Sequence, residues 1–418
     1  MNELKLLSHR CQIINPLSID DYLRSEGYEI LKKVLGSDKE KQIAEIKTSY
    51  LRGRGGAGFP VHIKLSALAK EKSDVKYLIC NADEGEPGNF KDRYLMENDP
   101  HSILEGMAIA AYITGANKGY IYIRGEYELA HETLDWAIKE ARRLNLLGKN
   151  ILGHGFDFDI CLHKGAGSYV CGEEFALIES IEGKPGRTRV KPPFPTQNGV
   201  FGKPTLINNV ETFATLPVIL KLGGENYAKI GTKSSTGTKL ISLSGNIKNK
   251  GVFEIPFGVT LRQVIDELGG GVVSDRKIKY VQLGGACGPI IPEYMLDLMI
   301  DFERFEEFDS KTGAGAIIVI DERFNLFDIL INVVEFFEHE SCGKCTPCRE
   351  GHQQLKVILK RFREKQANVK DLVSLESLAR VMHQTALCGL GQTSPTAIIS
   401  SLKYFRDDYI DRMDSLSL

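Results

Sequence analysis

The sequence lacks the features that would place it in a membrane or on nucleic acid. Its 418 residues carry a formal net charge of −2, which gives no electrostatic basis for binding a polyanion. No apolar run is long enough to span a bilayer, and the N-terminus has no apolar core of a signal peptide. We therefore expect a cytoplasmic chain without direct membrane insertion, at most peripheral to a membrane complex, in a compartment where thiols stay reduced.

Two common nucleotide-binding motifs are also missing. The stretch 52–60, RGRGGAGFP, has no Gly-Lys-Ser/Thr of a Walker loop and does not follow a strand as Gly-x-Gly-x-x-Gly requires. Its glycines still let the backbone approach a flat or phosphorylated ligand closely. It leads through Pro60 into a helix expected over 61–72, and the N-terminus of a helix suits an anion. A glycine-rich stretch alone is equally compatible with a flexible turn.

Strands and helices alternate through the first half of the chain. We expect strands at 75–80, 119–123 and 158–162, with helices at 102–115 and 127–146. This alternation predicts a parallel sheet covered by helices. Polar residues 81–88 follow the first strand, at the edge where such sheets bind ligands.

A second glycine-rich junction, residues 164–174, follows the strand near 160. The proline-rich stretch 191–195 then reads as stiff and extended, and residues 203–212 open another helix. The paired Asn208 and Asn209 can donate to phosphate or ring carbonyls, or they can cap that helix.

The composition changes after the linker at 231–238. Segments 239–245 and 251–255 read as a hairpin, followed by a helix at 260–268 and a strand at 278–283. These elements predict a small α+β module ending near 321. Residues 325–362 and 369–416 follow a helical pattern.

Four of the nine cysteines form a distinctive pattern. Cys342, Cys345 and Cys348 stand at three-residue steps, and Cys388 is remote. A 4Fe–4S cluster needs four converging thiolates and commonly takes such a loop plus one distant cysteine. Zinc is the alternative, but it favours two separated ligand pairs. Disulfides do not fit a reducing compartment.

Five motifs occur in a fixed order and together resemble a known family. They are RGRGGAGFP at 52–60, NADEGEPG at 81–88, YVCGEE at 169–174, NNVET at 208–212 and ESCGKCTPCR at 340–349. The set resembles the FMN- and NADH-binding flavoprotein subunit of respiratory complex I, a subunit type shared with NAD-linked hydrogenases and formate dehydrogenases. The resemblance runs from about residue 11 to 410.

The resemblance implies an α/β architecture in three parts. These are a Rossmann-like FMN- and NADH-binding domain with an N-terminal helical arm over 1–235, a ubiquitin-like β-grasp module of the soluble-ligand-binding type over 236–325, and a helical bundle carrying one 4Fe–4S cluster over 326–418. It also implies that NADH passes a hydride to FMN, and that electrons then pass singly to the cluster and to a partner subunit.

The resemblance further implies site residues. FMN would be held by Gly53, Arg54, Gly55, Gly56, Gly58, Lys64, Asn81, Asp83, Tyr169, Gly172, Asn208 and Asn209. NADH would face Phe59, Glu86, Glu174, Lys191 and Phe194, and the cofactor-binding set also includes Glu84 and Glu173. Cys342, Cys345, Cys348 and Cys388 would ligate the cluster. No side chain is expected to act as a catalytic acid or base, because the hydride moves between cofactors.

Elementary chemistry supports several of these roles. A carboxylate such as Glu174 near the adenosine ribose accepts hydroxyl hydrogen bonds and repels a 2′-phosphate, which favours NAD over NADP. Asp83 and Glu86 near a flavin would oppose further negative charge and so influence its potential. Phe59 and Phe194 can stack on cofactor rings.

The sequence departs from the family on the helix after the glycine stretch, at His62, Leu65 and Ala67. The family has glycine, tryptophan and often an aromatic residue there, so stacking from this helix is not expected. These changes support an alternative, a non-catalytic electron-transfer or scaffold subunit with a degraded nucleotide site. The chain carries no 2Fe–2S domain of its own, so we expect a thioredoxin-like 2Fe–2S subunit and a larger iron–sulfur subunit as partners in complex I, a hydrogenase, a formate dehydrogenase or an electron-bifurcating enzyme.

Overall fold

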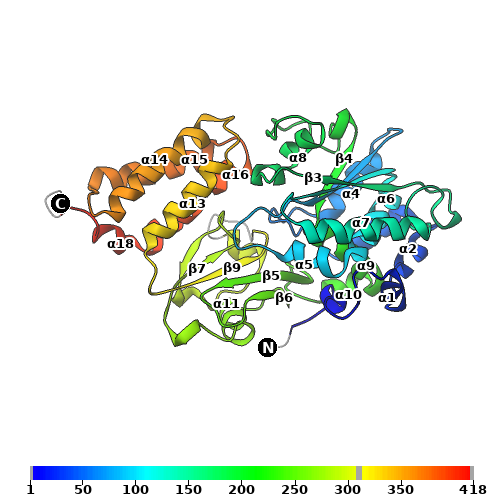
Figure 1. The fold of residues 1–418 in the computed structure, drawn as a ribbon, viewed down its shortest axis with the longest axis horizontal. Helices are drawn as coiled ribbons and strands as arrows, with labels where there is room; N and C mark the ends of the chain where they lie inside the picture. Colours follow the sequence, from blue (N-terminus) through cyan, green and yellow to red (C-terminus); the bar gives the residue numbers. More distant parts are fainter. Residues whose placement is uncertain (1–2, 307–312, 415–418) are drawn as a thin grey trace.

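Four parallel strands form the first sheet of the computed structural model, which describes residues 3–306 and 313–414 (Figure 1). The strands are β1 (Tyr77–Ala82), β2 (Lys118–Ile123), β3 (Asp159–Lys164) and β4 (Thr205–Asn209), in the spatial order β3–β2–β1–β4. The three earlier strands lie where the sequence predicts them. The strand β4 was not predicted, because the sequence from 203 reads as the opening of a helix.

Helices cover both faces of this sheet. They are α4 (Val61–Lys70), α6 (Pro100–Thr114), α7 (Glu128–Arg143), α8 (Glu174–Ile181) and α9 (Val210–Leu222). Side chains alternate between faces along a strand, so Leu78 and Cys80 of β1 join the core that includes α4, α6, α7 and α9. Tyr77 and Ile79 point the other way, into a core shared with α8 and the C-terminal helices.

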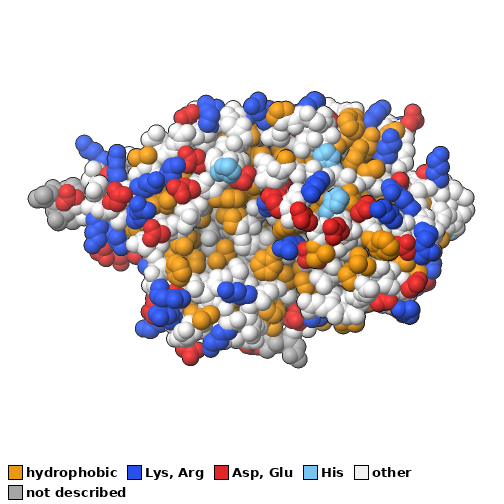
Figure 2. Space-filling view, viewed as in Figure 1, with side chains coloured by type: hydrophobic (Ala, Val, Ile, Leu, Met, Phe, Trp, Pro, Cys, Tyr) orange, Lys and Arg blue, Asp and Glu red, His pale blue; other side chains and the backbone are white. Residues whose placement is uncertain are grey.

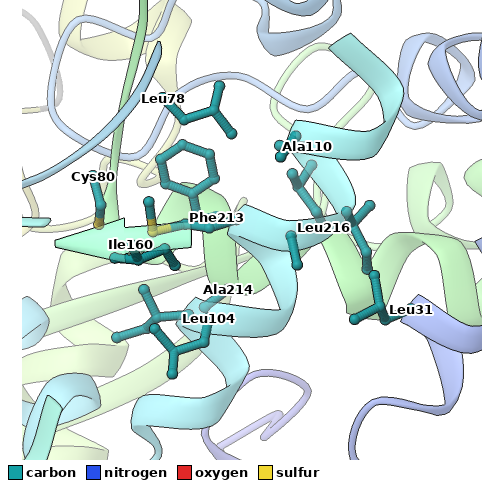
Figure 3. Packing of buried hydrophobic residues seen from close by; sticks show 14 of the residues in the cluster. Leu31, Leu78, Cys80, Leu104, Ala110, Ile160, Phe213, Ala214 and Leu216 are labelled. Atoms are coloured by element: carbon teal, nitrogen blue, oxygen red, sulfur yellow. The ribbon is translucent and has the colours of Figure 1, made fainter. Parts of the chain in front are cut away.

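The helices α6 and α9 pack closely at the centre of the first core. Gly106 of α6 lies against the backbone of Phe213 in α9, where a methyl group at Gly106 would stand 1.9 Å from the Phe213 carbonyl oxygen. Figure 3 shows Leu104 and Ala110 of α6 among Phe213, Ala214 and Leu216 of α9, with Leu78 and Ile160 from the strands. This packing holds α9, and therefore the end of β4, in a fixed position.

Short helices build the N-terminal arm and the remaining connections. They are α1 (Ile19–Arg24), α2 (Glu29–Val34), α3 (Lys39–Thr48), α5 (Lys91–Asn98) and α10 (Gly224–Ala228). Ser18 caps α1 as its position before two aspartates suggests, because its hydroxyl accepts the amide N–H of Asp21 at 3.2 Å. The arm is tied to the second sheet by Glu254, whose buried carboxylate accepts the amide of Ser8 at 2.8 Å.

The second sheet has five strands in the order β6–β5–β9–β7–β8. They are β5 (Thr238–Gly245), β6 (Gly251–Pro256), β7 (Ile278–Leu283), β8 (Ile290–Pro292) and β9 (Ala316–Asp321). The antiparallel pair β5–β6 is the predicted hairpin. The strands β8 and β9 were not predicted, and β9 lies between β5 and β7, parallel to the first and antiparallel to the second. The predicted helix begins as α11 (Leu261–Gln263) and continues as a π-helix over Val264–Leu268.

The C-terminal part is helical. It comprises α13 (Leu326–Glu340), α14 (Thr346–Arg363), α15 (Val369–Thr385), α16 (Gly389–Thr393), α17 (Thr396–Tyr404) and α18 (Arg406–Ile410). In Figure 1 these helices lie at the end of the molecule away from the N-terminal arm, and α16 lies beside α8. Cys342 and Cys345 lie in the turn from α13 into α14, and Cys348 lies in the first turn of α14.

The surface mixes charges of both signs. On the face drawn in Figure 2, Lys and Arg side chains are interspersed with Asp and Glu, and hydrophobic side chains show between them. This distribution matches the small net charge. Within residues 3–306 and 313–414, no helix combines the length and apolarity needed to cross a membrane.

Candidate flavin and iron–sulfur sites

The carboxyl ends of β1 and β4 form a topological switch point. From β1 the chain continues to β2 on one side, whereas β4 pairs with β1 on the other. Asn81 lies in register with Asn209, and Cys80 with Asn208. Ligands in open α/β sheets bind at this kind of crevice, just beyond the carboxyl ends of the strands.

The glycine-rich stretch 52–60 lies against this edge. A methyl group at Gly55 would stand 3.0 Å from Cβ of Asn209, and Gly58 adopts φ +63°, which favours glycine. The loop is closed by the N–H of Gly53, which donates to the Phe59 carbonyl at 2.9 Å. Gly55 therefore lies against the crevice, whereas a methyl group at Gly56 would meet the backbone of Gly313 and one at Gly58 would meet the ring of Phe302.

Arg54 lies inside this loop but its side chain turns away from the crevice. Its guanidinium is buried, and its Nη2 donates to the Thr236 carbonyl at 2.7 Å and to the Tyr227 hydroxyl at 3.1 Å, whereas Nε and Nη1 have no hydrogen-bond partner in the described structure. The ring of Phe257 lies 4.8 Å from the guanidinium carbon. Arg54 thus holds the loop to the base of the second sheet, a role that the sequence pattern did not suggest.

The second glycine-rich junction meets the same edge. Asn81 donates from Nδ2 to the Gly172 carbonyl at 2.8 Å, and its Oδ1 accepts the amide of Asp83 at 3.1 Å. A methyl group at Gly172 would lie 3.4 Å from the Asp83 carbonyl oxygen. Two segments far apart in sequence, after β1 and after β3, are therefore joined directly at the crevice.

Two polar groups at this edge have no partner in the described structure. They are Nδ2 of Asn208 and Oδ2 of Asp83, both buried. Burial raises the pKa of Asp83 to about 7, although the nearby Arg124 opposes the shift. Because buried polar groups are normally hydrogen-bonded, these two atoms mark where a bound ligand would supply the missing partners.

Asn209 is occupied within the protein. Its Oδ1 accepts the amide of Glu211, so it caps α9, and its Nδ2 donates to Asp92 at 2.6 Å. Asp92 pairs with the buried Lys91 at 2.6 Å, and Lys91 pairs with Glu211 at 3.0 Å. The capping alternative for the paired asparagines therefore holds for Asn209, while Asn208 keeps a free amide.

Two buried carboxylates follow β1. Glu84 accepts the amides of Asp92 and Arg93, at 3.0 and 2.9 Å, at the start of α5, and burial raises its pKa to about 8. Glu86 accepts the amide of Cys287 at 2.8 Å, and burial raises its pKa to about 7. Glu84 thus binds the first-turn amides of α5, whereas Glu86 links the first sheet to the turn between β7 and β8.

Of the residues expected to face NADH, Glu86 is buried, whereas the other four are at least partly exposed and form what we call the rim: Phe59, Glu174, Lys191 and Phe194. Lys191 pairs with Glu174 and lies 3.4 Å from Glu173. Glu173 caps α8 by accepting the amides of Phe175 and Ala176. Phe59 and Phe194 expose about half of their surfaces, 46% and 52%, so both rings are accessible to a ligand.

The helix α4 presents a different surface from the one the family pattern would give. Lys64 donates from Nζ to the Ile207 carbonyl of β4 at 3.0 Å, and burial lowers its pKa. Leu65 is fully buried in the core, while Ile63 is 46% exposed. The helix therefore offers Ile63, not residue 65, to solvent near the loop.

The four motif cysteines lie in one region of the helical part. Cys345 and Cys388 are the N-caps of α14 and α16, and neither thiol caps its helix. Burial raises the pKa of Cys348 to about 11, and the other three cysteines contribute electrostatically to that shift. Burial also raises the pKa of Cys388, opposed by the main-chain amides of Gly391 and Leu390. Mutual proximity and amides aimed at sulfur fit four thiolates around one cluster.

Among the residues that the structure describes, no three His, Cys, Asp or Glu side chains form a group that could hold a single metal ion. The cysteines therefore lie near one another without meeting at one point. A cluster of several irons and sulfides takes its four thiolates at separate irons.

Direct contacts join the cysteine turn to the flavin crevice. The amide of Tyr169 donates to Glu340 at 2.8 Å, and the Tyr169 ring lies 5.2 Å from that of Phe336. Lys344, inside the cysteine turn, donates to the Thr188 carbonyl at 2.7 Å. The two candidate sites are thus held together as one unit.

Sequence reasoning did not single out Cys287, Glu340 or His352. Cys287 lies in GGACGP at 284–289, whose glycines signal a tight turn near a ligand or another backbone. Glu340 opens the last motif but was not given a role of its own. His352 follows the third cysteine by one helical turn, which places it beside that cysteine.

Comparison with known proteins agrees with the two sites. Residues 46–218 match the family model described as the Nuo51 FMN-binding domain, and residues 328–412 match the NADH-ubiquinone oxidoreductase-F iron-sulfur binding region. The F subunit of the NADH-quinone oxidoreductase of Escherichia coli (strain K12) is 42% identical over 397 residues, which cover 94% of this chain and 89% of that protein. The chain belongs to the family of NADH-quinone oxidoreductase F subunits. It is accordingly an oxidoreductase component that binds FMN and an iron–sulfur cluster.

The chain is also similar to subunits of hydrogenases. The NADP-reducing hydrogenase subunit HndC of Solidesulfovibrio fructosivorans is 47% identical over 416 residues, covering 99% of this chain and 84% of that protein. A crystal structure of an NAD+-reducing [NiFe]-hydrogenase in the H2-reduced state superposes with a TM-score of 0.82 at 34% identity. The match covers 91% of this chain but only 64% of the hydrogenase chain.

Proposed function

We propose that this chain is the NADH-oxidising flavin subunit of a multisubunit redox complex. When bound, FMN would exchange a hydride with NADH, and a 4Fe–4S cluster would carry the electrons onward one at a time. The observation that carries the proposal is the crevice at β1 and β4, where Asn208 and Asp83 lack partners in the described structure. The same crevice is bonded to the cysteine turn through Tyr169 and Glu340.

The residues of the crevice have separable roles. The glycines at 53–58 bring main-chain groups to the ligand, and Asn208 donates from its free amide. Asp83 carries a raised pKa of about 7, so near neutral pH it can hold or release a proton at a buried position. Asn81, Arg54 and Asn209 act indirectly, because their polar groups hold neighbouring segments in place.

Nucleotide selectivity is assigned to the rim. Glu174 and Lys191 form an ion pair there, with side chains 25% and 36% exposed. We assign NADH as the substrate because the Glu174 carboxylate would accept hydrogen bonds from ribose hydroxyls and repel a 2′-phosphate. One observation favours NADPH as the substrate instead: the relative HndC, at 47% identity, is named as a subunit of an NADP-reducing hydrogenase. If Lys191 turned toward the ligand instead, it would attract that phosphate.

We further propose three domains, at 1–235, 236–325 and 326–418. The first sheet ends at Asn209 and the second spans Thr238 to Asp321, which supports these boundaries. The order β6–β5–β9–β7–β8, with one central parallel pair, supports a β-grasp-type module. The partners we expect are a thioredoxin-like 2Fe–2S subunit and a larger iron–sulfur subunit, in complex I, an NAD-linked hydrogenase, a formate dehydrogenase or an electron-bifurcating enzyme.

A scaffold subunit that carries electrons but binds no nucleotide is the second candidate. It is favoured by α4, where Leu65 is buried and His62 keeps a buried Nδ1 without a partner in the described structure. Measurement of FMN and iron per chain, together with NADH–ferricyanide activity, separates the two. A preparation with four irons and no FMN would favour the scaffold.

The position of the flavin is tested by Asn208→Leu, which keeps the side-chain size and removes the free amide. We expect FMN content and NADH–ferricyanide activity to fall together. Asn117→Ala is the matched control, because Asn117 donates to Asp74 at the opposite edge of the same sheet. Normal FMN content in the Asn208 variant would contradict the assigned position.

A further inference from the structure

The side chain of His352 contacts the sulfur of one motif cysteine. His352 lies one turn after Cys348 on α14, and its Nδ1 is 3.8 Å from Cys348 Sγ. The ring is 1% exposed, so water cannot replace this contact. We infer that His352 donates a hydrogen bond to the Cys348 sulfur and thereby raises the reduction potential of the cluster. This inference rests on the proposed function, in which Cys348 is a cluster ligand.

The surroundings of the ring fix the direction of this bond. A ligating thiolate has no proton, so only an N–H at Nδ1 makes a favourable contact with it. The neutral imidazole then carries a lone pair at Nε2. The Ser394 hydroxyl can donate its one proton to this Nε2 at 2.8 Å in place of the Gly391 carbonyl, which lies farther away at 3.2 Å. Second-shell partners of this kind set the tautomer and orientation of a ring. Ser394 therefore orients the donor.

Packing against neighbouring helices holds the His352 ring in this orientation. The ring of Phe337 lies nearly parallel to that of His352, with centroids 6.0 Å apart and an interplanar angle of 13°. Gly391 of α16 lies next to the same sulfur, since a methyl group at Gly391 would stand 3.4 Å from Cys348 Sγ. The contact is thus defined by α13, α14 and α16 together.

A second polar group touches the same sulfur. The Ser341 hydroxyl lies 3.2 Å from Cys348 Sγ and accepts the amide of Gly343 at 3.3 Å. Hydrogen bonds to cluster sulfurs stabilise the reduced, more negative state more than the oxidised one, which raises the potential. Cys348 would therefore receive two side-chain hydrogen bonds, one from Ser341 and one from the buried His352.

The test is a potentiometric titration of the cluster's paramagnetic signal in the full chain carrying His352→Leu. We expect four irons per chain and a potential lower by at least the equivalent of a tenfold change in the one-electron equilibrium, which is about 59 mV. His383→Leu is the matched control: this histidine of α15 bonds the Gln392 carbonyl at 2.8 Å. The cluster potential in the His383→Leu variant should match that in the unmodified chain.

Two outcomes would overturn the inference. One is a His352→Leu chain with four irons and an unchanged potential. The other applies if the His352→Leu variant loses iron. The variant Ser394→Ala then keeps the imidazole ring but removes the hydroxyl that orients it, and an unchanged cluster potential in this variant would refute the role of His352. Failure of the proposed function looks different, because the unmodified chain would then hold no 4Fe–4S cluster, or would hold four irons without FMN and without NADH–ferricyanide activity.

Discussion

Replacing Glu211 by Gln should strongly destabilise the protein. Glu211 is 1% exposed and lies at the start of α9, directly after the crevice asparagines. Its carboxylate accepts Lys239 Nζ at 2.6 Å and the Leu240 amide at 2.9 Å, both on β5, and pairs with Lys91 at 3.0 Å. It therefore joins the two sheets through a buried charge network.

The magnitude follows from what the substitution leaves behind. Glutamine keeps the shape and an acceptor for Leu240, but the two buried lysines, Lys91 and Lys239, lose the carboxylate that they share. Breaking a buried ion pair by removing one partner costs about 3–5 kcal/mol. At roughly 2 °C per kcal/mol for a unit of this size, the Tm should fall by about 6–10 °C.

Thermal unfolding followed by circular dichroism is the assay, with Glu26→Gln as the control. Glu26 also pairs with a lysine, Lys221 at 2.6 Å, but both side chains are more than half exposed. Exposed ion pairs contribute little to the free energy of unfolding, so the Glu26→Gln variant should have the same Tm as the unmodified chain. A Glu211→Gln variant as stable as the Glu26 control would refute the reasoning about the network.

Three further predictions concern the sites. Cys388→Ser should remove the cluster's paramagnetic signal in reduced protein, and an iron content that stays at four would show the ligand assignment to be wrong. Glu174→Gln should raise NADPH activity relative to NADH by about tenfold, or ~1.4 kcal/mol, whereas an unchanged ratio would count against the role of Glu174. Burial raises the pKa of Glu86 from 4.5 to about 7, so its contribution to stability is present below pH 4.5 and lost as the pH rises through about 7. Glu86→Gln should therefore unfold at the same Tm as the unmodified chain at pH 4.5 and be more stable at pH 8, by up to about 3 kcal/mol; equal differences at both pH values would contradict this.

The sequence predicts elements well where one pattern dominates. The strands β1 and β2 are apolar runs bounded by polar residues, α7 carries a helical period, and α6 is an apolar segment too long for a strand, so all four were found. The strand β4 was missed because Asn209 ends the strand and caps α9 at once. One short motif thus contains both elements, and the helical signal after it is the stronger.

The site was predictable as a set of segments but not as a set of contacts. The motifs indicated that the residues around 55, 83 and 172 belong to one site, and in the structure Gly172 lies against Asp83 while Gly55 lies against Asn209. They could not show that Asn209 meets Asp92, or that Arg54 meets Thr236. Such partners are brought together only by the packing of α5, α9 and the second sheet, which no local pattern encodes.

The most direct test of the central claim is to add NADH to the protein under anaerobic conditions. The flavin is followed by absorbance and the cluster by electron paramagnetic resonance. If the crevice at Asn208 holds a flavin that accepts the hydride, and the cysteines hold a cluster that takes electrons from it, NADH alone will bleach the flavin and produce the reduced-cluster signal. A signal that appears with dithionite but not with NADH would contradict the account.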